Sequence, residues 1–211
     1  PDKEAITLRP KMGTEKAWRG FRVDDDGNTL IPLRDGGNRL SGVYRVSPSG
    51  SAEILAGSGG IKGAHHVVGG RISKDPSEPI LIADDLTSAI ELNRHTHKPV
   101  VWVVNSENLK AVGENLRRYH PEREMLVAAM DAHMAKENRP LDLAREAAQA
   151  IKAEVLVPPL SGQDKKRNSM SFGDLLKGSD QSKVSDTLRS AGIKQKQKDT
   201  KPTQKVGRSI E

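Results

Sequence analysis

Residues 80–90 read Ile80-Leu-Ile-Ala-Asp-Asp-Leu-Thr-Ser-Ala-Ile90, and this stretch decides the fold. Its first four residues form a short, uninterrupted apolar run, which is typical of a strand buried on both faces of a parallel sheet. A helical pattern of apolar residues begins directly after the two carboxylates. Asp84 and Asp85 therefore lie where a buried strand ends and the next helix begins.

Two interpretations of this acidic pair stay open. In open α/β sheets, ligands bind at the carboxyl ends of the strands, and Mg²⁺ is held by one or two carboxylates together with substrate phosphates. The pair would then form part of a magnesium site. An aspartate before a helix is also a good N-cap, and it interacts favourably with the positive end of the helix dipole. Capping is the commoner of the two roles.

The same alternation of strand and helix continues along the chain. It predicts a parallel sheet with helices on both faces, because βαβ units are right-handed. The expected strands span residues 80–83, 100–104, 125–130 and 154–157, and the expected helices 86–96, 107–119 and 140–152. Asp131 follows the third of these strands. We therefore expect Asp84, Asp85 and Asp131 to meet at one edge of the sheet.

The preceding segment has a different pattern. Short apolar runs near residues 21–23, 30–33, 40–46 and 52–55 are separated by turns rich in Gly, Asp and Asn, which predicts an antiparallel meander. Residues 24–28 fit a hairpin turn better than a Ca²⁺ loop, because the ligand spacing of an EF-hand is missing. His65 and His66 follow, and adjacent strand residues point to opposite faces, so at most one of them faces any given site.

Charge is distributed unevenly over the 211 residues. Residues 1–157 hold 22 Lys/Arg and 22 Asp/Glu, whereas residues 158–211 hold 12 and 6, so the net charge of +6 lies in the last quarter. This predicts a basic, largely disordered tail that is either a solvated linker or a binding segment for nucleic-acid phosphates. The candidate phosphate-binding residues are Lys165, Lys166, Arg167, Lys194, Lys196 and Lys198. Aromatic residues make up only 3%, which leaves few side chains for base stacking.

Other features limit the location and extent of the chain. It has no cysteine, no signal peptide and no apolar run long enough for a membrane helix, so we expect it to be cytoplasmic. It begins with Pro1 rather than Met, which suggests a piece of a longer protein. The expected regions are a small β region at 1–78, an α/β core at 79–160 and a basic tail at 161–211.

Several short motifs, taken in order, resemble the Toprim (topoisomerase–primase) domain over residues 28–176. The version that they match is found in plasmid- and phage-type primases and in conjugative relaxases. The motifs are Leu30-Ile-Pro-Leu-Arg-Asp-Gly-Gly-Asn-Arg-Leu40, Val43-Tyr-Arg-Val46 with Ser49-Gly50, Gly60-Ile-Lys-Gly63, the core strands and helices, the helix from Leu141 to Ala150, and Ser171-Phe-Gly-Asp-Leu-Leu176. The resemblance implies a Toprim-like four-stranded parallel core.

The resemblance also implies two catalytic motifs, and the chain departs from both. A Glu-Gly pair follows the first strand in the family, and Asp84-Asp85 stands there; Asp84 would take the catalytic place of the glutamate. An Asp-x-Asp motif follows the third strand and binds Mg²⁺, and here it reads Met130-Asp131-Ala132. Both family aspartates are replaced, so Mg²⁺ is expected to bind weakly or not at all at Asp84, Asp85 and Asp131.

Three functional hypotheses follow. The leading one is a non-catalytic Toprim-like module of a DNA-processing protein, such as a conjugative relaxase or mobilisation primase, that binds DNA or protein during plasmid transfer. The second is an active, Mg²⁺-dependent primase-type nucleotidyl transferase with a rearranged acidic cluster. The third is a pure protein-interaction domain, recruited to conjugation or secretion machinery.

Overall fold

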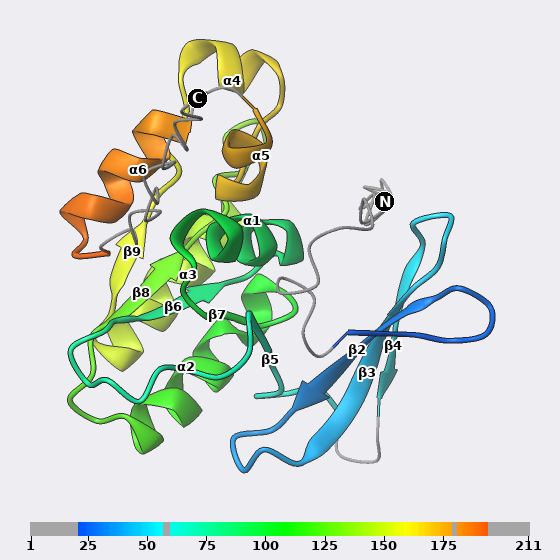
Figure 1. Ribbon diagram of the computed structural model, residues 1–211. Coiled ribbons are helices and arrows are strands. Elements are labelled where there is room, and N and C mark those ends of the chain that lie inside the picture. Colours follow the sequence, from blue (N-terminus) through cyan, green and yellow to red (C-terminus); the bar gives the residue numbers. More distant parts are fainter. Residues whose placement is uncertain (1–20, 57–59, 179–180, 194–211) are drawn as a thin grey trace, which may run out of the picture.

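A computed structural model describes residues 21–56, 60–178 and 181–193. It contains two β-sheets, one antiparallel and one mostly parallel (Figure 1). Helices flank the mostly parallel sheet, as the sequence predicted. The α/β fold class is therefore confirmed.

The first sheet is a meander of neighbouring hairpins with the strand order β1-β2-β3-β4. The tight turn between β1 and β2 forms because Asp24 accepts hydrogen bonds from the backbone N–H groups of Asp26 and Asn28. Residues 24–28 are thus a hairpin turn. The strands of this sheet are β1 (Arg22–Val23), β2 (Thr29–Arg34), β3 (Leu40–Val46) and β4 (Ala52–Ala56).

The second sheet has five strands in the order β5-β7-β6-β8-β9, and β5 is antiparallel to its neighbour β7. The sequence predicted the four parallel strands and missed β5. Because β5 comes from the region before residue 79, the expected boundary at 78/79 cuts through this sheet. The strands are β5 (His66–Val68), β6 (Ile80–Ala83), β7 (Val100–Trp102), β8 (Met125–Ala128) and β9 (Glu154–Leu156).

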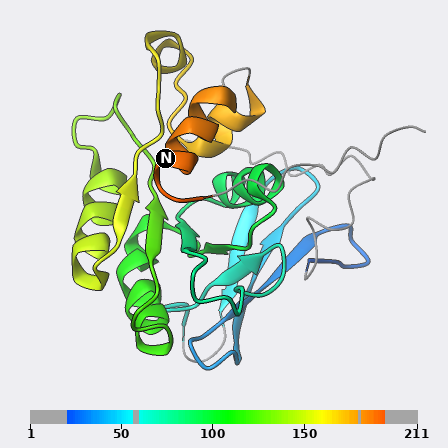
Figure 2. The same ribbon diagram turned by 60° about the vertical axis from the view of Figure 1, so that its left-hand side comes forward.

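Helices cover both faces of the second sheet, which explains why β6, β7 and β8 are buried throughout (Figure 2). Side chains of α2 and α3 form one apolar layer, and those of α1, α5 and α6 form the other. Ile31 and Leu33 of β2 join the second layer, so the two sheets share a core. The helices on the sheet are α1 (Leu86–Thr96), α2 (Leu109–Tyr119) after the 3₁₀ turn η1 (Ser106–Asn108), and α3 (Arg139–Ile151).

The segment after residue 160 differs from the expected flexible tail. Three helices lie in it: α4 (Gly162–Lys166), α5 (Phe172–Lys177) and α6 (Gln181–Ser190). Capping boxes begin α4 and α5, and five apolar side chains anchor α5 and α6 in the core because they recur at helical spacing. These side chains are Phe172, Leu175, Leu176, Val184 and Leu188. The remaining part of the predicted tail, residues 194–211, lies outside the described residues.

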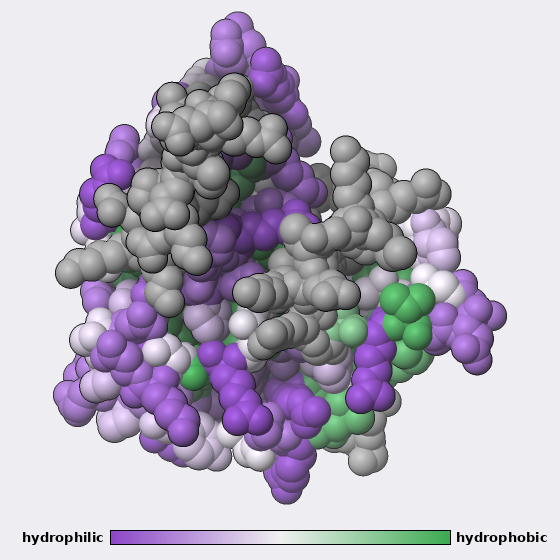
Figure 3. Space-filling model, in the orientation of Figure 1, coloured by the Kyte–Doolittle hydropathy of each residue, from purple (hydrophilic) through white to green (hydrophobic). Residues whose placement is uncertain are grey.

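The surface is mostly hydrophilic on the face that Figure 3 draws, and apolar side chains gather over the first sheet. Four of the exposed large apolar residues belong to that sheet or the turn beside it: Val23, Leu40, Ile54 and Leu55. None of the helices in the described part of the chain has the length and hydrophobicity to cross a lipid bilayer.

Candidate functional site: the acidic edge of the parallel sheet

The carboxyl ends of β6, β7 and β8 meet at one edge of the second sheet. Ala83, the last residue of β6, lies beside Trp102 of β7 on one side and Ala128 of β8 on the other. β6 is the central strand of the five, so Asp84, which follows it, stands at the middle of this edge. We call this edge of the sheet, with Asp84 and Asp85 after β6 and Asp131 after β8, the acidic edge.

Asp84 has a buried carboxyl group, and one of its two oxygens accepts a hydrogen bond from a side chain. Its side chain is 2% exposed. Ser106 Oγ donates to Asp84 Oδ2 at 2.6 Å, while Oδ1 has no partner among the described residues. Burial raises the pKa of Asp84 to about 7, the charge of Asp85 adds to this, and the Ser106 hydrogen bond opposes it. Asp84 therefore exchanges a proton near neutral pH.

Asp85 is the N-cap of α1, so the capping interpretation is confirmed for this residue. Its Oδ1 accepts from the backbone N–H of Ser88 at 2.7 Å, and its buried Oδ2 has no described partner. Burial raises the pKa of Asp85, the charge of Asp174 adds to the rise, and the Ser88 hydrogen bonds and the charge of Lys177 oppose it. Asp174 and Lys177 belong to α5, so α5 packs over the start of α1.

Asp131 forms hydrogen bonds with residues other than Asp84 and Asp85. Its Oδ1 accepts from Asn138 Nδ2 at 2.6 Å, and its backbone N–H donates to the carbonyl of Met170 at 2.7 Å. Asn138 also accepts from the N–H of Ala132. The carboxylate thus closes the loop between β8 and α3. Asp131 follows β8 at the acidic edge, but its side chain bonds to Asn138 in this loop and not to Asp84 or Asp85.

Ser106 is a functional candidate that the sequence reasoning missed. The preceding residue, Asn105, caps η1 by accepting from the backbone N–H of Asn108. The Ser106 hydroxyl is then available to Asp84. The preceding Val104 has φ +76°, which is strained for a β-branched residue, and such strain gathers at functional sites. The position of Ser106 shortly after β7, the strand beside β6, was the signal in the sequence that could have identified it.

The predicted basic residues divide into two groups. Lys165, Lys166 and Arg167 are exposed at the end of α4, and we call them the α4 basic cluster. The carbonyl of Lys165 lies 3.5 Å from Nε2 of His133, two residues after Asp131. The cluster therefore lies beside the loop at the acidic edge. Lys194, Lys196 and Lys198 lie outside the described residues.

The acidic edge does not match the ligand set of a protein-held Mg²⁺. Within the ranges that the structure describes, no three His, Cys, Asp or Glu side chains are grouped so that they could hold a metal ion. Met130 and Ala132 offer no side-chain oxygen, and the Asp131 carboxylate is bound to Asn138.

Replacing Ser106 with Ala tests the contact at Asp84. We expect the pKa of Asp84 to rise above about 7, because the Ser106 hydrogen bond favours the ionised form. At pH 8 the free energy of unfolding should fall by about 2 kcal/mol, the usual range for a hydrogen bond to a charged group. Carbon-13 NMR of the aspartate carboxyl groups measures the pKa. A titration of Asp84 that is unchanged in Ser106→Ala would contradict the contact.

Comparison with known proteins identifies the fold. No protein-family model matches the chain. Solved structures with a similar fold include the primase fragment of the bacteriophage T7 primase-helicase protein, with a TM-score of 0.57 and 13% identity over 80% of this chain. The Aquifex aeolicus primase (zinc-binding and RNA polymerase domains) has a TM-score of 0.54 and 10% identity over 82% of the chain.

A third similar structure is a DnaG primase catalytic domain bound to single-stranded DNA, with a TM-score of 0.52 and 9% identity over 81% of this chain. The chain spans 66%, 44% and 56% of the lengths of these three proteins. The identities are low, so the comparison concerns the arrangement of the strands and helices. That arrangement, an antiparallel sheet followed by a five-stranded and mostly parallel sheet, is the fold that the chain shares with these primase structures.

Proposed function

We propose that this chain is a nucleic-acid-binding Toprim module that lacks the metal-dependent chemistry of primases. The observation that carries the proposal is the acidic edge, where no three ligand side chains of the described residues are grouped and the Asp131 carboxylate is bound to Asn138. A fold persists more readily than the site built on it. The resemblance in sequence favours a conjugative relaxase or mobilisation primase as the parent protein, with a role in plasmid transfer.

The argument against catalysis rests on what phosphoryl transfer requires. Positioned Mg²⁺ ions neutralise the charge that develops on the transferring phosphoryl group, and the protein must hold them in place. The positions that correspond to the family's Asp-x-Asp motif hold Met130 and Ala132, which offer no ligand oxygen.

The argument for nucleic acid rests on the α4 basic cluster. Its three side chains are exposed, and the backbone carbonyl of Lys165 lies 3.5 Å from Nε2 of His133 in the loop after β8. Lysine and arginine side chains bind phosphates without reading sequence, and they fix the register of a strand on the protein. A single strand that follows the acidic edge would thus meet the cluster. Single-stranded DNA on one of the structural neighbours agrees with this choice of partner.

Replacing Lys165, Lys166 and Arg167 together with Gln tests the proposal. Binding of a fluorescent single-stranded DNA is measured by anisotropy over a range of salt concentrations. The slope of log K against log salt should become shallower by about 2, because each phosphate contact on a single strand contributes roughly 0.7. A control with the same charge change replaces Lys110, Arg145 and Lys152, which are exposed on α2 and at α3.

The control should leave the slope closer to that of the unchanged protein. Equal slopes for the two triple variants would show that the α4 basic cluster is not a binding site. If no DNA binds even at low salt, the chain is better explained as a protein-interaction domain.

A metal-dependent nucleotidyl transferase is the second candidate, and one observation favours it. Asp84 Oδ1 and Asp85 Oδ2 are buried oxygens of adjacent residues, and neither has a partner among the described residues. Buried polar atoms without partners call for an explanation, and an ion is one of them. Primer synthesis in the presence of Mg²⁺ or Mn²⁺, lost in Asp84→Asn, would support this candidate over the first.

A further inference from the structure

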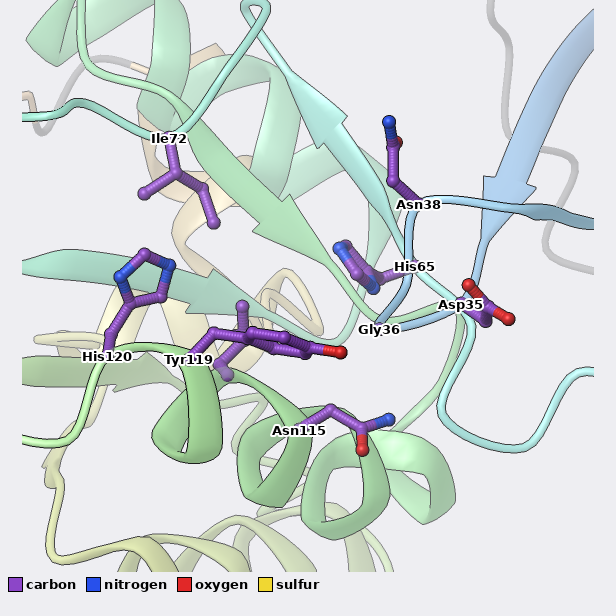
Figure 4. Close-up of a pocket in the computed structure, with 9 residues that line it drawn as sticks. Asp35, Gly36, Asn38, His65, Ile72, Asn115, Tyr119 and His120 are labelled. Atoms are coloured by element: carbon purple, nitrogen blue, oxygen red, sulfur yellow. The ribbon is translucent and has the colours of Figure 1, made fainter.

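A concave site lies away from the acidic edge. It is a pocket of about 140 Å³ between the β2–β3 hairpin, the chain around β5 and the end of α2 (Figure 4). We call it the β5–α2 pocket. β5 is an edge strand of the second sheet, and β7 separates it from β6 and Asp84. The lining residues are Asp35, Gly36, Asn38, His65, Ile72, Asn115, Leu116, Tyr119 and His120.

The pocket contains polar groups that have no hydrogen-bond partner in the described part of the chain. Nδ1 of His65 is buried and unpaired. Its neighbour His66 points elsewhere and contacts the carbonyl of Pro32, as the alternation of side chains along a strand predicts. Figure 4 shows the rings of His65 and Tyr119 on opposite sides of one space, with the amide of Asn115 below Tyr119.

The polar groups of the pocket are those of a site for a neutral ligand. Burial lowers the pKa of His65 and of His120, which favours the neutral form of both rings. A neutral imidazole offers one donor and one acceptor, and an Asn amide offers both kinds of group. The carboxylate of Asp35 is already occupied, because it accepts from Gly37 and Arg39. The pocket can therefore exchange several hydrogen bonds with an uncharged, planar heterocycle.

The size of the pocket limits that heterocycle to one ring. An engineered cavity of about 150 Å³ takes up a single benzene molecule, and the β5–α2 pocket has about 140 Å³. One six-membered ring fits, whereas the fused rings of a purine need more room. Tyr119 supplies a stacking face, and it is the one aromatic residue among the exposed large hydrophobic side chains of the described segments, at 58% exposure.

Two arginine side chains contact residues that line the pocket. Arg34 Nη1 donates to the carbonyl of Asn38 at 2.9 Å, and Arg39 Nε donates to Asp35 Oδ2 at 3.0 Å. We call these two guanidinium groups the arginine rim. A neutral pocket with a cationic rim has the charge distribution of a nucleotide-binding site, because the base is neutral and the phosphates on either side are anionic.

We propose that the β5–α2 pocket binds one unstacked pyrimidine base of a single-stranded nucleic acid, with the base against Tyr119 and its neighbouring phosphates on the arginine rim. This inference rests on the proposed function, since it names a subsite for the same class of partner. It adds a preference for base type, which the α4 basic cluster does not provide.

Binding of three labelled ten-nucleotide DNA strands to the full chain tests the proposal. The strands are oligothymidylate, oligoadenylate and an abasic strand of equal charge. We expect oligothymidylate to bind about tenfold more tightly than the abasic strand, which is the contribution of roughly one stacked base. Oligoadenylate should bind more weakly than oligothymidylate. Tyr119→Ala should remove the advantage of oligothymidylate, and Tyr119→Phe should keep most of it.

Leu55→Ala, a change at another exposed apolar residue, is the matched control and should leave all three affinities unchanged. A strand carrying 5-iododeoxyuridine should crosslink to the peptide that contains Asn115 and Tyr119. Equal binding of oligothymidylate and the abasic strand would overturn the pocket and leave the proposed function standing. Equal binding of oligothymidylate and oligoadenylate would overturn the pyrimidine assignment. No binding by any strand would overturn both proposals.

Discussion

The stability advantage of Asp84→Asn over the unchanged protein is expected to grow by up to about 4 kcal/mol between pH 4 and pH 8. The reason is that burial raises the pKa of Asp84 from 3.8 to about 7, and one pKa unit corresponds to about 1.4 kcal/mol. Asn keeps a carbonyl oxygen that accepts the Ser106 hydroxyl, and it carries no charge at any pH.

The direction follows from proton binding. Between pH 4 and pH 7 the folded protein keeps the proton of Asp84 while the unfolded chain has lost it, so stability falls as the pH rises. The stabilisation by the protonated form is complete below about pH 3.8 and is lost once the pH passes about 7. Urea unfolding of both proteins at several pH values measures the difference, and the slope in urea should stay the same.

Asp142→Asn serves as the control for this experiment. Asp142 lies in the first turn of α3 with its side chain 67% exposed, so the control should show no comparable change with pH. A difference between Asp84→Asn and the unchanged protein that is constant from pH 4 to pH 8 would mean that Asp84 titrates normally. The description of the acidic edge as buried would then fail.

Gly173→Ala is expected to lower the free energy of unfolding by about 3 kcal/mol, at the upper end of what overpacking costs. Gly173 lies in the first turn of α5, and its N–H donates to Ser88 Oγ at 2.9 Å. A Cβ added there would stand 2.6 Å from Thr87 Cγ2, 2.7 Å from the backbone nitrogen of Ser88 and 2.8 Å from the carbonyl carbon of Thr87. The backbone of α1 cannot move away without disturbing its Asp85 cap.

Gly113→Ala provides the comparison, because its added Cβ would meet one side chain and no backbone atom, at 2.7 Å from Cδ1 and 3.2 Å from Cγ2 of Ile151. Alanine is also favoured over glycine inside a helix by about 1 kcal/mol, so this change should shift stability by no more than about that amount. Urea unfolding measures both variants. Similar small losses in the two would show that α5 does not pack on the start of α1, and that the segment after residue 160 is separable from the core.

The sequence predicted the parallel core well because the signals there are local. Residues 80–83, 100–104 and 125–130 are apolar runs of strand length that end at Asp84, Asn105 and Asp131, and a helical pattern follows each of them. β5 was missed because three residues carry no period, and it forms only by pairing with β7. The basic composition after residue 160 hid α5 and α6, whose anchoring depends on a few apolar side chains such as Phe172.

The position of the acidic edge could be predicted from the sequence, but the hydrogen bonds of its residues could not. Asp84 and Asp131 follow neighbouring parallel strands, so their place at one edge could be inferred from topology. The bond from Asp131 to Asn138 depends on the path of a loop, which no pattern specifies. The β5–α2 pocket was invisible in the sequence, because it is assembled from the hairpin at Asp35, the strand entry at His65 and the end of α2.

The most direct test of the central claim is a calorimetric titration of the full chain with Mn²⁺ and Mg²⁺ at pH 8, where Asp84 is largely ionised. If the acidic edge has lost its ligand set, neither ion should bind saturably at millimolar concentration, and Asp84→Asn and Asp131→Asn should give the same flat trace. Saturable binding of about one ion per chain that disappears in both variants would show that the acidic edge has kept a metal site. It would then favour the metal-dependent nucleotidyl transferase.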